Sequence, residues 1–119
     1  MSKVYNLGSI NLDRTINVEH FPKSGETIKG RVFEDSLGGK GMNVSVALQR
    51  AGQPVAHIGA LHRHDNLLME LLDQSNIDQT FVEKSDHASG QAYIFLDRDA
   101  ENSIVVCGGA NLAISQDHI

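Results

Sequence analysis

The chain has 119 residues, of which 40% are hydrophobic, so it is long and apolar enough to form one domain with its own core. Its 15 acidic and 10 basic residues give a formal net charge of -5 and leave no basic stripe, which argues against nucleic-acid binding. No apolar run approaches the roughly 20 residues needed to cross a bilayer, so we expect no membrane role.

Short strands and a polar loop are predicted at the N-terminus. Residues 4–10 have the composition of a strand, which runs into a polar cluster containing Asn11 and Asp13. Pro22 and Gly25 are expected to break the segment that follows into separate pieces by forming turns. Alternation of apolar and polar residues predicts short, half-exposed strands in this segment, over residues 15–19, 27–29 and 31–33.

A helix is predicted over residues 44–51, because its apolar residues recur at the spacing of one helix face, and Gly52 and Pro54 then end it. Residues 55–61 have the length and composition of a strand. Asp65 can cap a second helix. The leucines of that helix fall on one face, at Leu67, Leu68, Leu71 and Leu72.

The last third of the chain predicts three more strands, over residues 81–83, 91–96 and 103–107. A polar turn joins the last two into an antiparallel pair. Cys107, the single cysteine, cannot form an internal disulfide, and its apolar neighbours predict that it is buried. Ser115 could cap a further helix. The alternation of strands and helices predicts an α/β fold, with a sheet of mostly parallel strands and a small antiparallel flap.

The densest motif is Leu-Gly-Gly-Lys-Gly-Met-Asn at residues 37–43, between a strand and the best helix. Its glycines allow a backbone to approach a ligand closely, and the first turn of the helix offers unpaired N–H groups. Lys40 and Asn43 can donate hydrogen bonds to hydroxyl or phosphate oxygens. The spacing differs from that of a Walker loop, because Gly41 follows Lys40. The simpler interpretation is a turn that opens a helix.

A second motif contains Asn11 and Asp13, which lie two residues apart, so their side chains share a face of an extended backbone. An ionised carboxylate accepts hydrogen bonds from two hydroxyls, while an amide both donates and accepts. Together they suit the vicinal hydroxyls of a sugar. The alternative for such a pair is local turn chemistry.

In chain order, the sequence contains Gly-Ser-Ile-Asn-Leu-Asp at 8–13, Phe-Pro-Lys-Ser-Gly-Glu-Thr at 21–27, Gly-Gly-Lys-Gly-Met-Asn at 38–43 and Gly-Gly-Ala-Asn at 108–111. This ordered set, with Ala47, resembles the N-terminal signature of the ribokinase family of carbohydrate kinases. The resemblance covers nearly the whole chain. It implies a ribokinase-like fold, of which residues 1–119 form the N-terminal part, and a sugar site at the carboxyl ends of the sheet strands.

By matching position, the resemblance implies roles for five residues. Asn11 and Asp13 would bind sugar hydroxyls. Gly39, Lys40 and Asn43 would contact the same sugar from the other side.

The resemblance also implies a lid made from strands near residues 14–36 and 91–107, which would exclude water from the reaction. The lids of two copies could pair to form a homodimer.

The expected ligand is a small sugar. Because the first residues lack the apolar core of a signal peptide, the expected compartment is the cytoplasm.

The chain departs from the family pattern in two places. His62-Arg63-His64-Asp65 stands where the family usually has a Gly-Asp-Asp-like stretch. The family's Gly-Ala-Gly-Asp segment, which carries the catalytic base and the anion hole, does not occur in these residues. We therefore expect that these residues include no catalytic residue. We also expect that a C-terminal part of the complete family enzyme binds ATP and Mg²⁺. Phosphoryl transfer depends on a complete site, so this chain alone is expected to be inactive.

Two alternatives compete with the sugar kinase. His62 and His64 could supply two ligands to a zinc ion, with Asp65 as a third, which would indicate a zinc hydrolase. The chain could instead be an inactive remnant or an interaction module, because a sheet with unpaired edges and apolar faces favours self-association.

Overall fold

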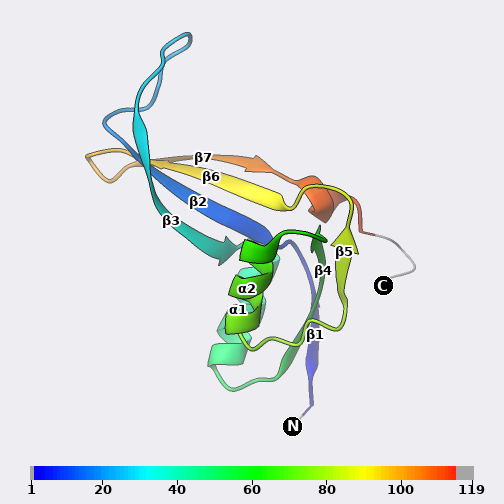
Figure 1. The fold of residues 1–119 in the computed structure, drawn as a ribbon. Helices are drawn as coiled ribbons and strands as arrows, with labels where there is room; N and C mark the ends of the chain where they lie inside the picture. The colour runs from blue at the N-terminus through cyan, green and yellow to red at the C-terminus, as the bar shows by residue number, and fades with distance from the viewer. Residues whose placement is uncertain (1, 115–119) are drawn as a thin grey trace.

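The computed structural model describes residues 2–114, which form two sheets that meet at one end (Figure 1). The smaller sheet is parallel, with the strand order β1-β4-β5: β1 (Val4–Leu7), β4 (Val55–His62) and β5 (Val82–Ser85). Helix α1 (Lys40–Arg50) follows β3 (Gly30–Gly38) of the larger sheet and leads into β4, and α2 (Asn66–Gln74) connects β4 to β5; the buried side chains of both helices share one core with β4. The predicted α/β class is confirmed.

The larger sheet has the order β3-β2-β6-β7: β2 (Asn11–Val18), β3 (Gly30–Gly38), β6 (Gly90–Leu96) and β7 (Asn102–Cys107). Its outer pairs, β2–β3 and β6–β7, are antiparallel, whereas the central pair β2–β6 is parallel. A short 3₁₀-helix, η1 (Gly109–Leu112), follows β7 and lies against the smaller sheet. These strands cover the ranges near residues 14–36 and 91–107 that the resemblance assigns to the lid, and Figure 1 shows them extending away from the helices.

Several predicted boundaries differ from the observed ones because a strand needs a partner. β1 ends at Leu7, where its pairing with β4 ends, and not at residue 10. The predicted strand at residues 27–29 is wrong: the pairing of β2 with β3 stops at Gly30, so these residues have no neighbouring strand. β3 instead continues to Gly38, far beyond residue 33.

The helices are confirmed, with one shifted start. α1 begins at Lys40, four residues before the predicted boundary. The prediction missed the first turn because this turn is glycine-rich and polar and carries no apolar pattern. α2 begins directly after Asp65, whose carboxylate accepts a hydrogen bond from the Leu68 amide at 3.1 Å, as predicted for an N-cap.

The core lies between the helices and both sheets. Leu68 and Leu72 of α2 are fully buried against Met42 of α1, Leu61 of β4 and Ile10, the residue before β2. The β1–β2 connection therefore contributes to the same core as the helices, which fixes its position relative to the start of α1.

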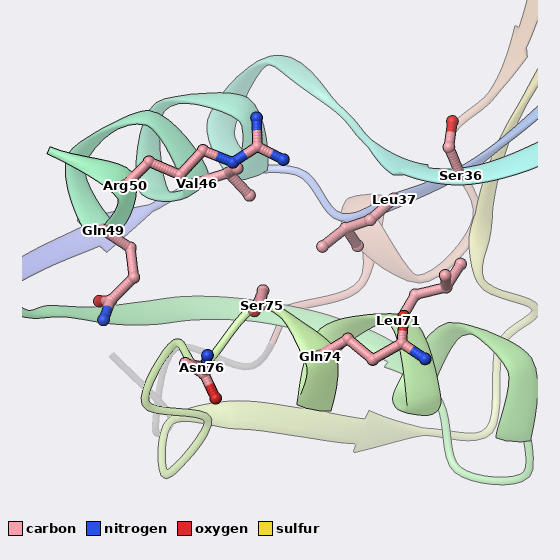
Figure 2. A pocket seen from close by; sticks show the side chains of 9 residues that line it. All are labelled: Ser36, Leu37, Val46, Gln49, Arg50, Leu71, Gln74, Ser75 and Asn76. Atoms are coloured by element: carbon pink, nitrogen blue, oxygen red, sulfur yellow. The ribbon is translucent and has the colours of Figure 1, made fainter.

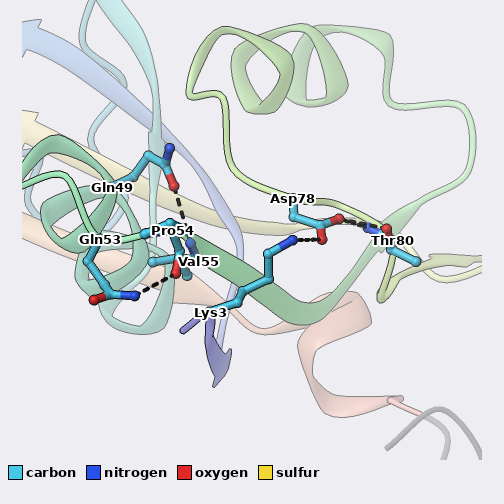
Figure 3. A network of polar contacts seen from close by, with 7 residues as sticks. All are labelled: Lys3, Gln49, Gln53, Pro54, Val55, Asp78 and Thr80. Carbon is cyan, nitrogen blue, oxygen red and sulfur yellow. Dashed lines mark hydrogen bonds and ion pairs between the residues drawn. The ribbon is translucent and has the colours of Figure 1, made fainter. Parts of the chain in front are cut away.

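Polar contacts tie the N-terminal end of β1 to its neighbours (Figure 3). Lys3 Nζ lies 2.8 Å from the carboxylate of Asp78, which also accepts from the amide and hydroxyl of Thr80. The hydrogen bond from Lys3 is the main cause that holds the pKa of Asp78 well below its ordinary range. Because both groups are solvent-accessible, this pair adds little stability.

Cys107 is exposed, so the prediction that it is buried is wrong. It ends β7, an outer strand whose six residues are all exposed, because nothing among residues 2–114 covers that edge. No helix within these residues is long and apolar enough to cross a membrane. The helix predicted after Ser115 lies outside the described residues.

Candidate functional site

The candidate site is built around a close backbone contact between Gly8 and Gly41. A Cβ atom on Gly8 would lie 2.5 Å from the Cα of Gly41, and one on Gly41 would overlap Gly8 in return. Only glycine permits this approach. Beside it, the Met42 amide donates to the Ser9 carbonyl at 3.0 Å. The two polar motifs of the sequence are therefore neighbours in the fold.

Asp13 lies on β2 next to Gly38 of β3. The strand register pairs Asp13 with Ser36 of β3 and Ala92 of β6, so these three side chains share one face of the larger sheet. A Cβ atom on Gly38 would overlap the carboxylate of Asp13. The carboxylate thus occupies the space that any side chain at position 38 would need.

The carboxylate of Asp13 has no hydrogen-bond or ion-pair partner among residues 2–114. Its partial burial raises the pKa of the carboxyl group above the ordinary value of 3.8. A partly desolvated, unpaired carboxylate is well suited to accept hydrogen bonds from the hydroxyls of a ligand.

Asn11 is held by Asn111, a residue to which the sequence assigned no role. Asn111 Nδ2 donates to Asn11 Oδ1 at 2.8 Å, and the same amide exchanges two hydrogen bonds with the backbone of Ile10, at 2.9 and 3.1 Å. The oxygen of Asn11 therefore has a partner, whereas its NH₂ group has none among residues 2–114. The Gly-Gly-Ala-Asn motif signalled this position, but its contact with Ile10 depends on residues 101 positions apart.

Gly39, Lys40 and Asn43 lie at the start of α1. Gly39 has a φ of 97°, a conformation that favours glycine, and its carbonyl accepts from the Asn43 amide at 2.8 Å. Within the described residues, neither the side chains of Lys40 and Asn43 nor the backbone N–H groups of Lys40 and Gly41 have a hydrogen-bond partner. The positive end of the helix therefore carries free donors beside the free carboxylate of Asp13.

The structure does not support the zinc alternative. The rings of His62 and His64 lie 5.7 Å apart, and His62 Nδ1 accepts from the His64 amide at 3.1 Å. Asp65 is used as the N-cap of α2. In the part of the chain that the structure describes, no group of three or more His, Cys, Asp or Glu residues could hold a metal ion.

A cavity of about 530 Å³ lies between α1, α2 and β3 (Figure 2). It is lined by Ser36, Leu37, Val46, Gln49, Arg50, Leu71, Gln74, Ser75 and Asn76. None of the five predicted sugar-binding residues borders it. The candidate site is therefore a polar junction distinct from this cavity, and it is marked by the unpaired carboxylate of Asp13.

The whole chain, residues 1–119, matches the model of the pfkB family carbohydrate kinases. The chain belongs to this family. Among pfkB relatives, the ribokinase of Haemophilus influenzae is 38% identical over 113 residues, which are 92% of this chain and 37% of that protein. The chain thus spans little more than a third of the length of that relative.

Two solved structures of ribokinases share the fold. The enzyme from Cryptococcus neoformans, in complex with ADP, gives a TM-score of 0.79 at 32% identity and covers 92% of this chain and 36% of its own. The enzyme from Arabidopsis thaliana, complexed with ribose and ATP, gives a TM-score of 0.78 at 28% identity and covers 97% of this chain and 40% of its own. The ribokinase-like fold predicted from the motifs is confirmed.

Proposed function

We propose that this chain is the sugar-binding N-terminal portion of an ATP-dependent carbohydrate kinase that transfers phosphate to a hydroxyl of a ribose- or fructose-like sugar. The observation that carries the proposal is the unpaired, partly buried carboxylate of Asp13, next to the uncapped start of α1. A carboxylate that accepts and a helix end that donates are the two halves of a site for vicinal hydroxyls.

Each residue has a distinct part in this proposal. Asp13 accepts from two hydroxyls of the sugar, and the NH₂ group of Asn11 donates to a neighbouring oxygen. Lys40, Asn43 and the backbone at Gly39 contact the opposite side of the same ring. The relatives that support a sugar as the ligand are named ribokinases, and one of them was solved with ribose.

The four strands of the larger sheet are proposed to act as the lid. They extend from the side of the junction that carries Asp13, and their closure over a bound sugar would exclude water, which competes with the sugar hydroxyl for the phosphoryl group.

ATP and Mg²⁺ belong to the complete family enzyme in this proposal. ATP supplies the phosphoryl group, and Mg²⁺ neutralises its charge. Residues 2–114 include no group of three or more His, Cys, Asp or Glu side chains that could hold this ion. The described residues bind and orient the sugar, and the chain alone is expected to have no kinase activity.

The proposal is tested by titrating the 119-residue chain with D-ribose and with D-fructose while recording the amide NMR signals. Saturable shifts should concentrate at Asp13, Gly39, Lys40 and Asn43. Shifts spread evenly over the surface, or confined to the cavity between α1 and α2, would contradict the site.

Asp13→Ala should weaken sugar binding by about 2 kcal/mol, roughly thirtyfold, because it removes the acceptor of two hydroxyls. The same loss is expected in kcat/KM for the sugar in a complete enzyme that contains this chain. Asp99→Ala, on the exposed turn between β6 and β7, is the matched control and should leave binding unchanged. Equal binding by the two variants would refute the assignment of Asp13.

An interaction role for the same lid strands is favoured by their exposed apolar residues. On the outer strands these are Val32, Phe33, Ile104, Val105 and Val106, with 51 to 61% of each residue exposed. We propose that a second copy of the chain covers them in a homodimer. The alternative of an inactive remnant or interaction module also predicts self-association.

A further inference from the structure

His57 is a titratable residue that the sugar site described above does not use, and it is fully buried. It lies on β4, beneath the start of α1. Its Nε2 atom is 2.9 Å from the carbonyl oxygen of Gly8, and its Nδ1 atom is 2.7 Å from the hydroxyl of Ser45. One imidazole ring therefore joins β4 to both the β1–β2 connection and α1.

The partners of the ring fix its tautomer. A carbonyl oxygen can only accept, so Nε2 must carry the proton that is donated to Gly8. In a neutral ring Nδ1 is then an acceptor, and the Ser45 hydroxyl donates to it. Ser45 Oγ accepts in turn from Asn6 Nδ2 at 2.9 Å, and Asn6 Nδ2 also lies 2.9 Å from the carbonyl oxygen of Gly41. Each of these polar groups has a compatible partner.

This network surrounds the glycine contact on which the sugar site depends. Its two ends are the carbonyl groups of Gly8 and Gly41, the two residues whose backbones touch. Gly8 is also held by its amide, which donates to the Ile58 carbonyl at 3.0 Å. The Gly8–Gly41 contact has no side chains of its own to interlock, so the hydrogen bonds of this network add to core packing and to the Met42–Ser9 bond in setting its geometry.

We propose that His57, acting with Ser45 and Asn6, is a positioning residue that holds Gly8 against Gly41 and so sets the spacing between Asp13 and the start of α1. The inference rests on the proposed sugar-binding function but concerns residues that touch no sugar. A shift of about 1 Å between two halves of a binding site is enough to lose much of its affinity.

The surroundings of the His57 ring favour its neutral form, with one proton held at Nε2. Burial lowers the pKa of His57 below its ordinary value, and the bond to Gly8 offsets this only in part. None of the side chains bonded to the ring is charged, and Asp78, whose backbone carbonyl accepts from the His57 amide, has its carboxylate bound to Lys3 and Thr80. The imidazole therefore stays neutral near pH 7 and serves as a fixed donor and acceptor.

The first experiment is independent of sugar. ¹⁵N NMR of the imidazole in the 119-residue chain should show a neutral ring protonated at Nε2. In His57→Phe, hydrogen exchange of the Met42 amide, which bridges to Ser9, should accelerate on the order of tenfold relative to the Leu61 amide in the core. Ser45→Ala, a milder change, should act in the same direction. A ring protonated at Nδ1, or unchanged exchange at Met42 in both variants, would overturn the proposal.

The second experiment measures D-ribose binding by the same chain. His57→Phe and Ser45→Ala should each weaken binding about fivefold, the loss expected for roughly one hydrogen bond, while the amide spectrum stays dispersed. The matched control is Val82→Ala, a core change on β5 that lacks these hydrogen bonds and should bind ribose normally although it is destabilised.

The outcomes separate the two proposals. If the unmodified chain binds ribose and the folded variants bind it equally well, the positioning role is wrong and the sugar site stands. If the unmodified chain binds no ribose but the exchange at Met42 accelerates as expected, the sugar function fails, whereas the role of His57 in holding Gly8 against Gly41 is supported.

Discussion

At the scale of single residues, the environment of Asp13 in the folded chain favours ligand binding and lowers the stability of the fold. The carboxylate is partly removed from water, and the described residues give it no compensating hydrogen bond. Such groups persist in proteins where they serve binding, because folding alone would favour their replacement.

Asp13→Asn should therefore raise the free energy of unfolding at pH 7. The folded pKa of Asp13 lies above its unfolded value of 3.8, so the unfolded chain ionises first, and the wild-type chain loses stability as pH rises from 3.8 through the folded pKa. The neutral amide avoids this loss. Urea unfolding of both chains at pH 3 and pH 7 should show a difference only at pH 7.

Asp99→Asn is the matched control, because Asp99 lies on an exposed turn, and it should show no difference at either pH. A destabilised Asp13→Asn chain at pH 7 would mean that the carboxylate has a favourable partner in solution.

At the scale of elements, the start of α1 is positioned by two glycines, Gly8 and Gly41, which have no side chains and so allow their backbones to touch. A helix usually gains from alanine in place of glycine, by about 1 kcal/mol in its interior. At Gly41 this gain is opposed by contact with the backbone of Gly8, which cannot move aside as a flexible side chain would. We expect the cost of this clash to exceed the gain in helix propensity.

Gly41→Ala should destabilise the chain by about 2 kcal/mol or more, since it forces the β1–β2 connection away from α1. Thermal unfolding measures this loss, and D-ribose titration should show weaker binding at temperatures where the variant is still folded. Val44→Ala, at an exposed position one turn along the same helix, serves as the control and should change stability by no more than about 0.5 kcal/mol. Equal stability of the two variants would contradict the tight contact.

At the scale of the whole molecule, the larger sheet leaves apolar residues on its outer strands. β7 pairs only with β6, and among residues 2–114 nothing covers its other edge. Val105 and Val106 are more than half exposed and, as successive strand residues, point to opposite faces. The smaller sheet also exposes apolar residues, including Tyr5 and Leu7 of β1, so two surfaces compete for self-association.

If the lid strands form the homodimer, whichever of Val105→Lys and Val106→Lys lies on the covered face should convert the dimer to a monomer, because a lysine in an apolar interface is desolvated without a partner. Sedimentation equilibrium at several concentrations measures this shift. Tyr5→Lys, on the smaller sheet, should leave the dimer intact. The reverse pattern would move the interface to β1 and refute the pairing of lids.

Much of the fold could be predicted from local patterns. The helix capped by Asp65, the strand at β4 and the β6–β7 hairpin follow from periodicity and turn chemistry, which depend on neighbours in the sequence. The start of α1 and the length of β3 could not be found in this way, since the first depends on a backbone contact with Gly8 and the second on pairing with β2.

By itself, the sequence determined the α/β class, the family resemblance and the identity of the polar residues at 11–13 and 39–43, because these are carried by residue types and their order. Only the tertiary structure decided that Asn11 Oδ1 accepts a hydrogen bond from Asn111, that Asp13 is unpaired, and that His57 lies beneath the glycine contact. These properties depend on groups brought together across 49 to 100 positions of the chain, and no local pattern encodes which of them will meet.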